Sequence, residues 1–502
     1  MTAAAVALAV GELVSALGGG TPSLVTAIGG EFIDRFAAGL KDLAVSLFGT
    51  NDKTALIVGI VVIALAIGAG LGAVAVRRRR FAAGGFVAFG LIGWWAYATD
   101  PQGGVGLGLI AATLATAAGI GTLFGLAQLL PPEPVPGQPS ATPGPHVATR
   151  RAVLGASGAA LAVAVLGAVG SRRLRGSDTV DATRATTRLP TPANTTATVP
   201  APGANPFDVA GLTPYITPND GFYRIDTALQ TPRVDVGGWT LKVTGMVDEP
   251  FELSYEELVE LATTEETVTL SCVSNEVGGG LVGNAVWQGV PLATLLERAG
   301  VHDDADQIVG RSVDDFTAGF PTEVGLDGRV AMVAVAMNGE PLPVRHGFPA
   351  RLVVAGLYGY VSATKWLSEI ELTTLGGLDG YWISRGWAKE APVKTQSRID
   401  VPRAGARLTA GRQAIAGVAW APPGGISRVE VGIDGVWHDA DLGDAANGNT
   451  WVQWVDVWDA TAGEHRIQVR ATDSRGVTQT EEASSPAPDG ATGWHSRTVG
   501  VV

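Results

Sequence analysis

The sequence predicts an α+β protein with transmembrane helices at the N-terminus, a mixed α+β domain, and an all-β sandwich at the C-terminus. Long apolar runs are confined to residues 1–171 of the 502-residue chain, and several of them are long enough to cross a bilayer as helices. From residue 207 onward, short strands, turns and short amphipathic helices alternate. After about residue 400 the helical signals end, and strands at the spacing of a β-sandwich follow.

Four apolar runs are the predicted membrane spans, at 54–76, 81–99, 104–130 and 152–170. Residues 3–19 are a weaker candidate because Glu12 interrupts a short run. Residues 31–49 carry spaced charges on a helical apolar period, which indicates an interfacial helix. The cluster Arg77–Arg80 predicts a cytoplasmic loop. Counting spans from that loop places the chain after residue 171 outside the cytoplasmic membrane, in a multi-pass protein that contacts membrane lipid.

Arginines at 172, 173 and 175 follow the last span and oppose this orientation. The stretch 149–167 offers an account, because Arg150 and Arg151 precede a weakly hydrophobic core and resemble an internal twin-arginine export signal. The alternative is a pair of ordinary flanking arginines. On either side of this span, Pro-rich 131–151 is expected to be an extended cytoplasmic linker and Thr/Pro/Ala-rich 172–206 a flexible stalk. The predicted units are therefore 1–130, 131–151, 152–171, 172–206, 207–398 and 399–502.

Charge and residue types exclude several classes of function. Residues 1–200 hold 14 basic and 9 acidic residues, whereas residues 201–502 hold 21 and 39. The acidic C-terminal portion argues against a nucleic-acid partner, since phosphates need a basic surface. The single cysteine, Cys272, excludes an intrachain disulfide, a zinc knuckle and a cysteine-ligated iron–sulfur cluster. None of the six histidines lies in a predicted span, so we expect no haem in this chain.

Individual elements can be predicted in the soluble portion. Two strands and two helices are expected, at 241–247, 267–272, 255–262 and 292–300. Residues 329–343 should form a hairpin through an Asn338-Gly339 turn. Tryptophans fall on both sides of the strand at 451–458, which indicates that one face of its sheet meets another domain or subunit.

Cys272 ends an apolar strand and precedes a glycine-rich loop. Three roles are open for it: a buried small hydrophobe, a nucleophile with a histidine partner, or a thiolate ligand to a metal held mainly by a cofactor. The glycines would let the backbone approach a bulky ligand closely.

Residues 218–502 resemble the sulfite-oxidase family of molybdopterin enzymes, with a catalytic domain followed by an immunoglobulin-like dimerisation domain. The segments "TPNDGFYRID", "LSCVSN" and "VWQGVPLATLLERAG" match in order. The most specific match is "AMNGEPLPVRHGFPARLVVAGLYGYVSATKWLSEIEL", and "TGWHSRTVGV" is similar to the closing strand of the second domain.

The resemblance implies a molybdenum–molybdopterin cofactor, in its form without a nucleotide, with the Cys272 thiolate as the protein's ligand to the metal. Arg351 and Lys365 would bind the cofactor's phosphate, and His346 would offer a ring N–H. The further residues that would bind the cofactor are Asn219, Phe222, Tyr223, Arg224, Asn275, Asp315, Thr317 and Trp366. The resemblance also implies a small-molecule substrate, an electron-transfer partner such as a cytochrome or quinone-linked protein, and a homodimer formed through 399–502.

The substrate side departs from the family pattern. Val277, Trp387 and Gln453 stand where sulfite-oxidising relatives place arginine, tyrosine and arginine, and Glu276 adds an acid. Fewer cations weaken the capture of a dianion such as sulfite. With Arg224 and Trp387 beside Cys272 as the predicted catalytic residues, we expect oxygen-atom transfer with a less charged substrate, S- or N-oxide reduction being favoured. The alternatives are sulfite oxidation, a non-catalytic membrane-tethered binding module and, last, a transporter.

Overall fold

The computed structural model describes residues 1–17, 21–33, 52–129, 150–176, 179–194 and 199–502. The chain divides into two units, one of residues 1–179 with 228–232, the other of residues 180–227 with 233–502. Most of the expected interfacial helix at 31–49 and of the linker at 131–151 lies outside the described residues.

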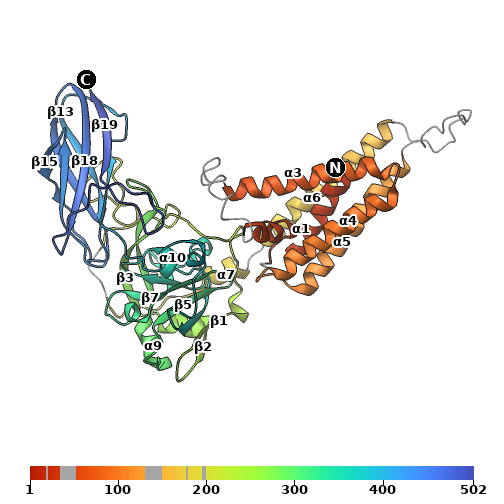
Figure 1. Ribbon diagram of the computed structural model, residues 1–502, viewed down its shortest axis with the longest axis horizontal. Coiled ribbons are helices and arrows are strands. Elements are labelled where there is room, and N and C mark those ends of the chain that lie inside the picture. The colour runs from red at the N-terminus through yellow and green to blue at the C-terminus, as the bar shows by residue number, and fades with distance from the viewer. Residues whose placement is uncertain (18–20, 34–51, 130–149, 177–178, 195–198) are drawn as a thin grey trace, which may run out of the picture. The chain divides into compact units, whose positions relative to one another are not determined.

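The first unit is helical throughout its described elements (Figure 1). They are α1 (Thr2–Ala16), a helix at Leu24–Ile33, α3 (Asp52–Ala75), α4 (Arg79–Thr99), α5 (Val105–Gln128) and α6 (Arg150–Gly176). Four helical segments within the described ranges have the length and apolar composition to cross a membrane: Lys53–Ala75, Arg79–Thr99, Val105–Gln128 and Leu154–Ser171. They correspond to the four predicted spans. Helix α1, which contains Glu12, is a shorter apolar helix.

Small residues let these helices approach one another. A Cβ built at Gly119 of α5 would lie 2.6 Å from the ring of Phe86 on α4, so only glycine allows this contact. Helix α3, by contrast, exposes large apolar side chains: Val62 is 57% exposed and Ile63 60%. Such an unbroken apolar surface is costly in water and suits contact with lipid.

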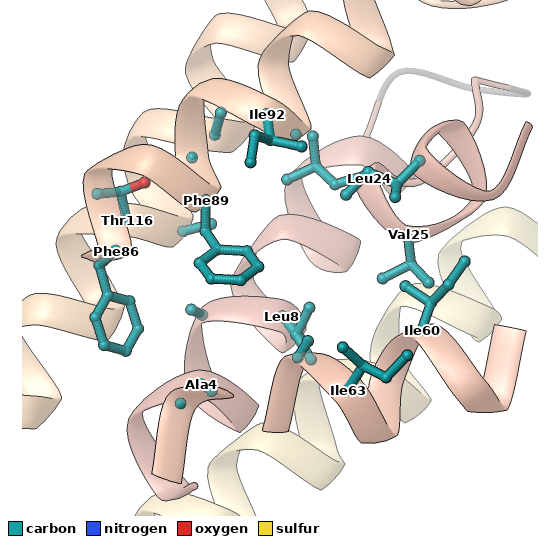
Figure 2. A pocket seen from close by; sticks show the side chains of 18 of the residues that line it. Ala4, Leu8, Leu24, Val25, Ile60, Ile63, Phe86, Phe89, Ile92 and Thr116 are labelled. Carbon is teal, nitrogen blue, oxygen red and sulfur yellow. The ribbon is translucent and has the colours of Figure 1, made fainter. Parts of the chain in front are cut away.

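An apolar cavity of about 550 Å³ lies among the helices of this unit. Figure 2 shows three side chains that line it: Phe89 of α4, Leu24 of the helix Leu24–Ile33, and Ile63 of α3. The hydroxyl of Thr116 is the polar group among its labelled side chains.

The second unit begins with two five-stranded sheets (Figure 1). One has the order β3-β4-β7-β8, with β9 paired to β7, and the other the order β2-β1-β10-β5-β6. The strands are β1 (Thr240–Gly245), β2 (Phe251–Ser254), β3 (Thr264–Ser271), β4 (Val282–Pro291), β5 (Gln307–Ser312), β6 (Thr317–Pro321), β7 (Ala331–Met337), β8 (Glu340–Pro341), β9 (Arg351–Val354) and β10 (Leu367–Thr373). The helices are α8 (Tyr255–Leu261), α9 (Leu292–Ala299) and the short α10 (Gly359–Ser362).

Local chemistry explains why these elements begin and end where they do. Ser254 and Glu257 form a reciprocal capping box at the start of α8. Gly300 ends α9 in the left-handed region, at φ 65°. Asn338 and Gly339 both have positive φ, 53° and 79°, as a tight hairpin turn between β7 and β8 requires. The two strands, two helices and hairpin predicted from the sequence are confirmed.

The C-terminal residues form two sheets, β11-β13-β17-β16 and β12-β19-β18-β14-β15. Their strands are β11 (Gln396–Val401), β12 (Arg407–Leu408), β13 (Gly411–Trp420), β14 (Ile426–Ile433), β15 (Val436–Asp439), β16 (Asp441–Leu442), β17 (Val452–Ala460), β18 (Gly463–Asp473) and β19 (His495–Val501). Trp454 lies in the core between the sheets, whereas Trp451 is buried in the core of the preceding α+β domain. One sheet face thus meets another domain, as predicted. An immunoglobulin-like topology and dimerisation stay predictions.

The expected flexible stalk at 172–206 differs in its described residues. Residues 179–186 form helix α7 (Thr179–Thr186), and Val180 enters the core of the α+β domain. Arg184 donates from Nε and Nη2 to the carbonyl oxygens of Leu342 and Pro341, at 2.7 and 3.0 Å. Composition suggested a stalk because the segment is poor in apolar residues. Val180, Arg184 and hydrogen bonds from Asn194 to Glu265 and Glu266 nevertheless attach it to the domain.

Candidate active site

Cys272 lies at the start of the loop that joins β3 to β4, here called the cysteine loop (residues 272–281). The backbone N–H of Cys272 donates to the carbonyl of Leu281 at 2.9 Å, and its carbonyl accepts from Asn275 N–H at 3.1 Å. The side-chain oxygen of Asn275 accepts from Leu281 N–H at 2.8 Å. These bonds close the loop on itself, and the Cys272 side chain is buried at its base, 8% exposed. The structure thus gives Asn275, a predicted cofactor contact, the task of closing this loop.

An aromatic pair lies beside the cysteine. Phe222 and Tyr223 stack with ring centroids 5.2 Å apart, and Phe222 also contacts the rings of Trp287 and His346 edge-on, at 5.8 and 5.7 Å. Burial raises the pKa of the Tyr223 phenol far above its usual value; the charge of Cys272 raises it further and Arg351 opposes this. The phenol therefore lies within electrostatic reach of both the thiol and the guanidinium.

Two buried cations and a histidine form the other side of the site. Arg351 begins β9 and is 5% exposed. Its Nη1 donates to the carbonyl of His346 and its Nε to that of Leu352. Its guanidinium lies 4.9 Å from the centroid of the Trp287 ring. Lys365 donates to Asp226 at 2.9 Å. His346 donates from Nε2 to the carbonyl of Asn219 at 2.8 Å.

Burial perturbs all three groups in the direction that favours their neutral forms. It lowers the pKa of Arg351 to about 10 and that of Lys365 to about 8, although Asp226 partly counters the second effect. It lowers the pKa of His346 to about 4, with the positive charges of Arg351 and Lys365 contributing. His346 is therefore neutral near pH 7, and the two cations are held there at a cost.

The donor groups of this cluster fit a buried anionic cofactor. Nη2 of Arg351 makes no hydrogen bond with the described part of the chain, and Arg351 has no carboxylate partner there. Asp226 is shared between Lys365 and Arg224, at 2.9 and 2.8 Å, so the site keeps a surplus of positive charge. A phosphate would satisfy the unused donors and offset the cost of burial. In the described residues no three His, Cys, Asp or Glu side chains cluster to hold a metal ion, so a metal here would bring most of its ligands with it.

Asn219 and Trp366 support the cluster through protein contacts. The amide of Asn219 bonds the hairpin residues Asn338 and Glu340, at 2.8 and 2.6 Å, which fixes the carbonyl that His346 binds. Trp366 has φ 50° and donates from Nε1 to Val344 at 2.8 Å. Both side chains thus fix the loop that carries His346.

Asp315 and Thr317, which were predicted to contact the cofactor, belong to the β5–β6 hairpin. Asp315 forms the turn at φ 61°, and Thr317 pairs with Arg311. Their neighbour Asp314 is buried, which raises the pKa of its carboxyl, and the charge of Asp226 adds to this effect. The turn therefore lies close to the Lys365–Asp226 pair.

Trp387 belongs to an aromatic group with Tyr360 and Trp382. Its ring centroid lies 5.7 Å from that of Tyr360 and 6.4 Å from that of Trp382. Burial raises the pKa of the Tyr358 phenol to about 12, with smaller effects from Asp489 and Cys272. Tyr358 thus lies within electrostatic reach of the thiol and of the Tyr360 phenol.

Three residues of this region were missed by sequence reasoning: Trp287, which contacts Arg351; Tyr358, which lies within electrostatic reach of the thiol; and Tyr360, which contacts Trp387. All three lie within segments already matched to the family, "VWQGVPL" and "GLYGY". Their aromatic character was visible in those segments, but nothing in their spacing showed that they converge on one site.

This chain is similar to known molybdopterin-binding proteins. Residues 228–382 match the family described as "Oxidoreductase molybdopterin binding domain". An oxidoreductase of Bacillus subtilis (strain 168), YuiH, whose name calls it uncharacterized, is 35% identical over 153 residues, which cover 30% of this chain and 74% of that protein. This chain belongs to the sulfite-oxidase family of molybdopterin-dependent oxidoreductases. Residues 228–382 form an oxidoreductase-type molybdopterin-binding domain, and its cofactor is the molybdenum cofactor.

Other family members match over a smaller share of their length. Mitochondrial sulfite oxidase of Mus musculus is 29% identical over 272 residues, which cover 45% of this chain and 49% of that protein. The chain thus spans about half the length of the mammalian sulfite oxidases that it matches. The sulfane dehydrogenase SoxCD of Paracoccus pantotrophus shares the fold, with a TM-score of 0.51 and 24% identity over 58% of this chain and 84% of that one.

Proposed function

We propose that this family member is a membrane-anchored, extracytoplasmic oxidoreductase that transfers oxygen atoms at a molybdenum ion bound by Cys272, on a substrate other than sulfite. One observation carries the proposal: the chain's sole thiol and the buried Arg351, which has no carboxylate partner among the described residues, both act electrostatically on the same phenol, that of Tyr223. The thiol and the phosphate-binding cation would therefore lie at the two ends of one cofactor.

The chain's residues divide the work of holding the cofactor. Cys272 would donate its sulfur to the metal, since a thiolate suits a soft or high-valent ion. Arg351 would hold the terminal phosphate with Nη2, and Lys365 would add a second charge. His346, neutral at pH 7 and bonded to Asn219, would keep that end of the site closed. When bound, the cofactor supplies oxygen-atom transfer coupled to two electrons.

The substrate side supports a less charged substrate. Arg224 is paired with Asp226, and Gln453 donates its amide to the carbonyl of Thr213. Trp387, which contacts Tyr360, would add aromatic surface on the substrate side. Losing a charged hydrogen-bond partner costs roughly 1.5–3 kcal/mol, so two absent arginines would weaken the binding of a dianion by several powers of ten. A neutral S- or N-oxide keeps its affinity in such a site.

The helical unit supports the location. Helix α3 exposes a continuous apolar surface, and the Arg77–Arg80 cluster follows it. With that cluster in the cytoplasm, α6 would deliver residues 179–502 to the outer side. Electrons would then pass to or from a separate redox protein or a quinone-linked partner.

Metal analysis and one substitution test the proposal. The purified full-length protein should contain molybdenum, and Cys272→Ser should abolish turnover and change the absorption spectrum of the metal centre. The fold should persist, because serine retains the backbone bonds of Cys272. A Cys272→Ser enzyme with full activity, or a wild-type protein purified without molybdenum after expression with ample molybdate, would contradict it.

A further inference from the structure

The cysteine loop is held from outside by the C-terminal sheets. A Cβ built at Gly278, where φ is 76°, would lie 2.2 Å from Cδ2 of His495 on β19. At the next residue, the carbonyl of Gly279 accepts from Nη1 of Arg398 on β11 at 2.9 Å. Two strands of the C-terminal sheets thus grip two consecutive residues of the loop that begins at Cys272.

Arg398 uses all three of its guanidinium nitrogens within the protein. Besides the bond to Gly279, Nε donates to Asp400 at 2.7 Å and Nη2 donates to the hydroxyl of Thr213 at 2.8 Å. Asp400 in turn accepts from Thr213 N–H at 3.1 Å. The side chains of Arg398 and Asp400 are only 10% and 8% exposed. The charge is therefore neutralised and the donors are occupied, so Arg398 is built to hold protein groups and not to bind a substrate anion.

Strand register relates Arg398 to the position where the family pattern has an arginine. Val418 of β13 pairs with Arg398 on one side and with Gln453 of β17 on the other. Residues in one row across neighbouring strands point to the same face of a sheet. Gln453 also contacts Thr213, by donating to its carbonyl at 2.7 Å. In the row Arg398–Val418–Gln453, the positive charge therefore lies on β11, two strands from Gln453, where it contacts the cysteine loop at Gly279.

His495 is fixed as firmly as Arg398. Its Nδ1 accepts from Ile399 N–H at 2.9 Å, which ties β19 to β11 between the two sheets, and the residue is 7% exposed. Its ring therefore cannot turn away from Gly278 without breaking a buried hydrogen bond.

We propose that Arg398 and His495 are positioning residues for Cys272: together they orient the cysteine loop, so that the place of the thiol depends on the C-terminal sheets. The loop's own bonds set its shape, and these two contacts set its orientation against the rest of the site. Positional errors of about 1 Å at a reacting centre can cost about a hundredfold in rate. This inference rests on the proposed role of Cys272 as the metal ligand.

The sole thiol gives a readout that does not depend on turnover. In cofactor-free full-length protein, the rate at which a maleimide modifies thiols reports on Cys272 alone. Arg398→Met and His495→Ala should each raise this rate about tenfold or more, because the buried thiol becomes accessible when the loop loses an anchor. The labelling rate of Arg398→Lys should lie between those of Arg398→Met and wild type, since an amine cannot reproduce the planar, forked donor geometry of the guanidinium. Arg412→Met, an exposed arginine on β13, is the matched control and should leave the rate unchanged.

A pair of substitutions tests the contact itself. Gly278→Ala should also raise the labelling rate, because its methyl group meets His495 and because alanine is strained at φ 76°. Adding His495→Ala should raise the rate by less than the product of the two single effects, since both changes disturb the same contact. In cofactor-loaded enzyme, Arg398→Met should alter the absorption spectrum of the metal centre and lower kcat more than it raises KM. Circular dichroism and the melting temperature identify any variant that fails to fold. If Arg398→Met does not fold, the labelling rates of Arg398→Lys and of the Gly278→Ala variants test the proposal instead.

The outcomes separate this inference from the proposed function. Wild-type labelling rates and spectra in Arg398→Met, Arg398→Lys and His495→Ala would overturn the positioning role, even if Cys272→Ser abolishes turnover. Retention of molybdenum and activity in Cys272→Ser would instead overturn the proposed function. Single effects that multiply in the Gly278→Ala, His495→Ala double variant would show that His495 does not act on the loop through Gly278.

Discussion

Arg351→Met should change stability in opposite directions with and without the cofactor. In the cofactor-free protein, burial lowers the pKa of Arg351 from 12.5 to about 10. At about 1.4 kcal/mol for each tenfold change in the proton equilibrium, holding the charge there costs about 3 kcal/mol. Methionine removes this cost but also loses two hydrogen bonds to carbonyl oxygens. At 3.4 and 3.2 Å both are long and therefore weak, so together they are worth about 1–2 kcal/mol. The cofactor-free variant should therefore be more stable by about 1–2 kcal/mol.

With the cofactor bound, the same substitution should be harmful. It removes a charged hydrogen bond to the phosphate, worth about 1.5–3 kcal/mol, which corresponds to roughly ten- to a hundredfold weaker retention. Molybdenum content and pterin fluorescence after gel filtration measure retention, and the melting temperature from tryptophan fluorescence measures stability in both forms. We expect the cofactor-free melting temperature to rise by about 2–5 °C.

Arg329→Met is the matched control for this experiment. Arg329 is paired with Asp327 at 2.6 Å and lies on the loop before β7. Its loss should cost at most about 1 kcal/mol, equally in both forms. An Arg351→Met protein that keeps the cofactor at wild-type occupancy, or that is destabilised in the cofactor-free form, would refute the assignment of Arg351 as a phosphate-binding residue buried at a cost.

Three further predictions concern acid stability, location and substrate. Burial lowers the pKa of His346 from 6.5 to about 4, so the unfolded chain takes up the proton first and the free energy of unfolding falls as pH drops from 6.5 toward 4, by about 2 kcal/mol at pH 5. The melting temperature of His346→Gln should therefore depend less on pH than that of wild type. Parallel melting curves for the two proteins would disprove this. In intact cells, a membrane-impermeant maleimide should label Ser485→Cys but should label Arg78→Cys only after lysis. Ser485 is exposed in the C-terminal portion, and the native Cys272 is buried and adds little background. The reverse labelling pattern would show that the topology is inverted. Steady-state assays should give poor sulfite oxidation at physiological ionic strength and better reduction of a neutral S- or N-oxide by dye-reduced enzyme, and a micromolar KM for sulfite would reject this view of the pocket.

The sequence by itself determined the local elements and the identity of the key groups. Apolar runs of about twenty residues can only be buried or placed in lipid, so the four long helices were predictable from composition. The Asn338-Gly339 turn and the Gly300 helix end depend on backbone preferences that a few neighbouring residues decide. Cys272 stood out because no second cysteine competes with it, and family resemblance supplied Arg351, Lys365 and His346.

Only the tertiary structure decided how those groups are used. Whether Arg351 is a surface charge or a buried cation without a carboxylate depends on what packs around β9, and Trp287 comes from a strand more than sixty residues away. The cation at Arg398 was invisible as a neighbour of Cys272, because 126 positions separate them and only the pairing of β11 with β13 and the packing of β19 bring it to Gly279. The segment 179–194 was mistaken for a stalk for the same reason: weak local preference is overridden by a few long-range contacts, and a single sequence does not state which distant residues will provide them.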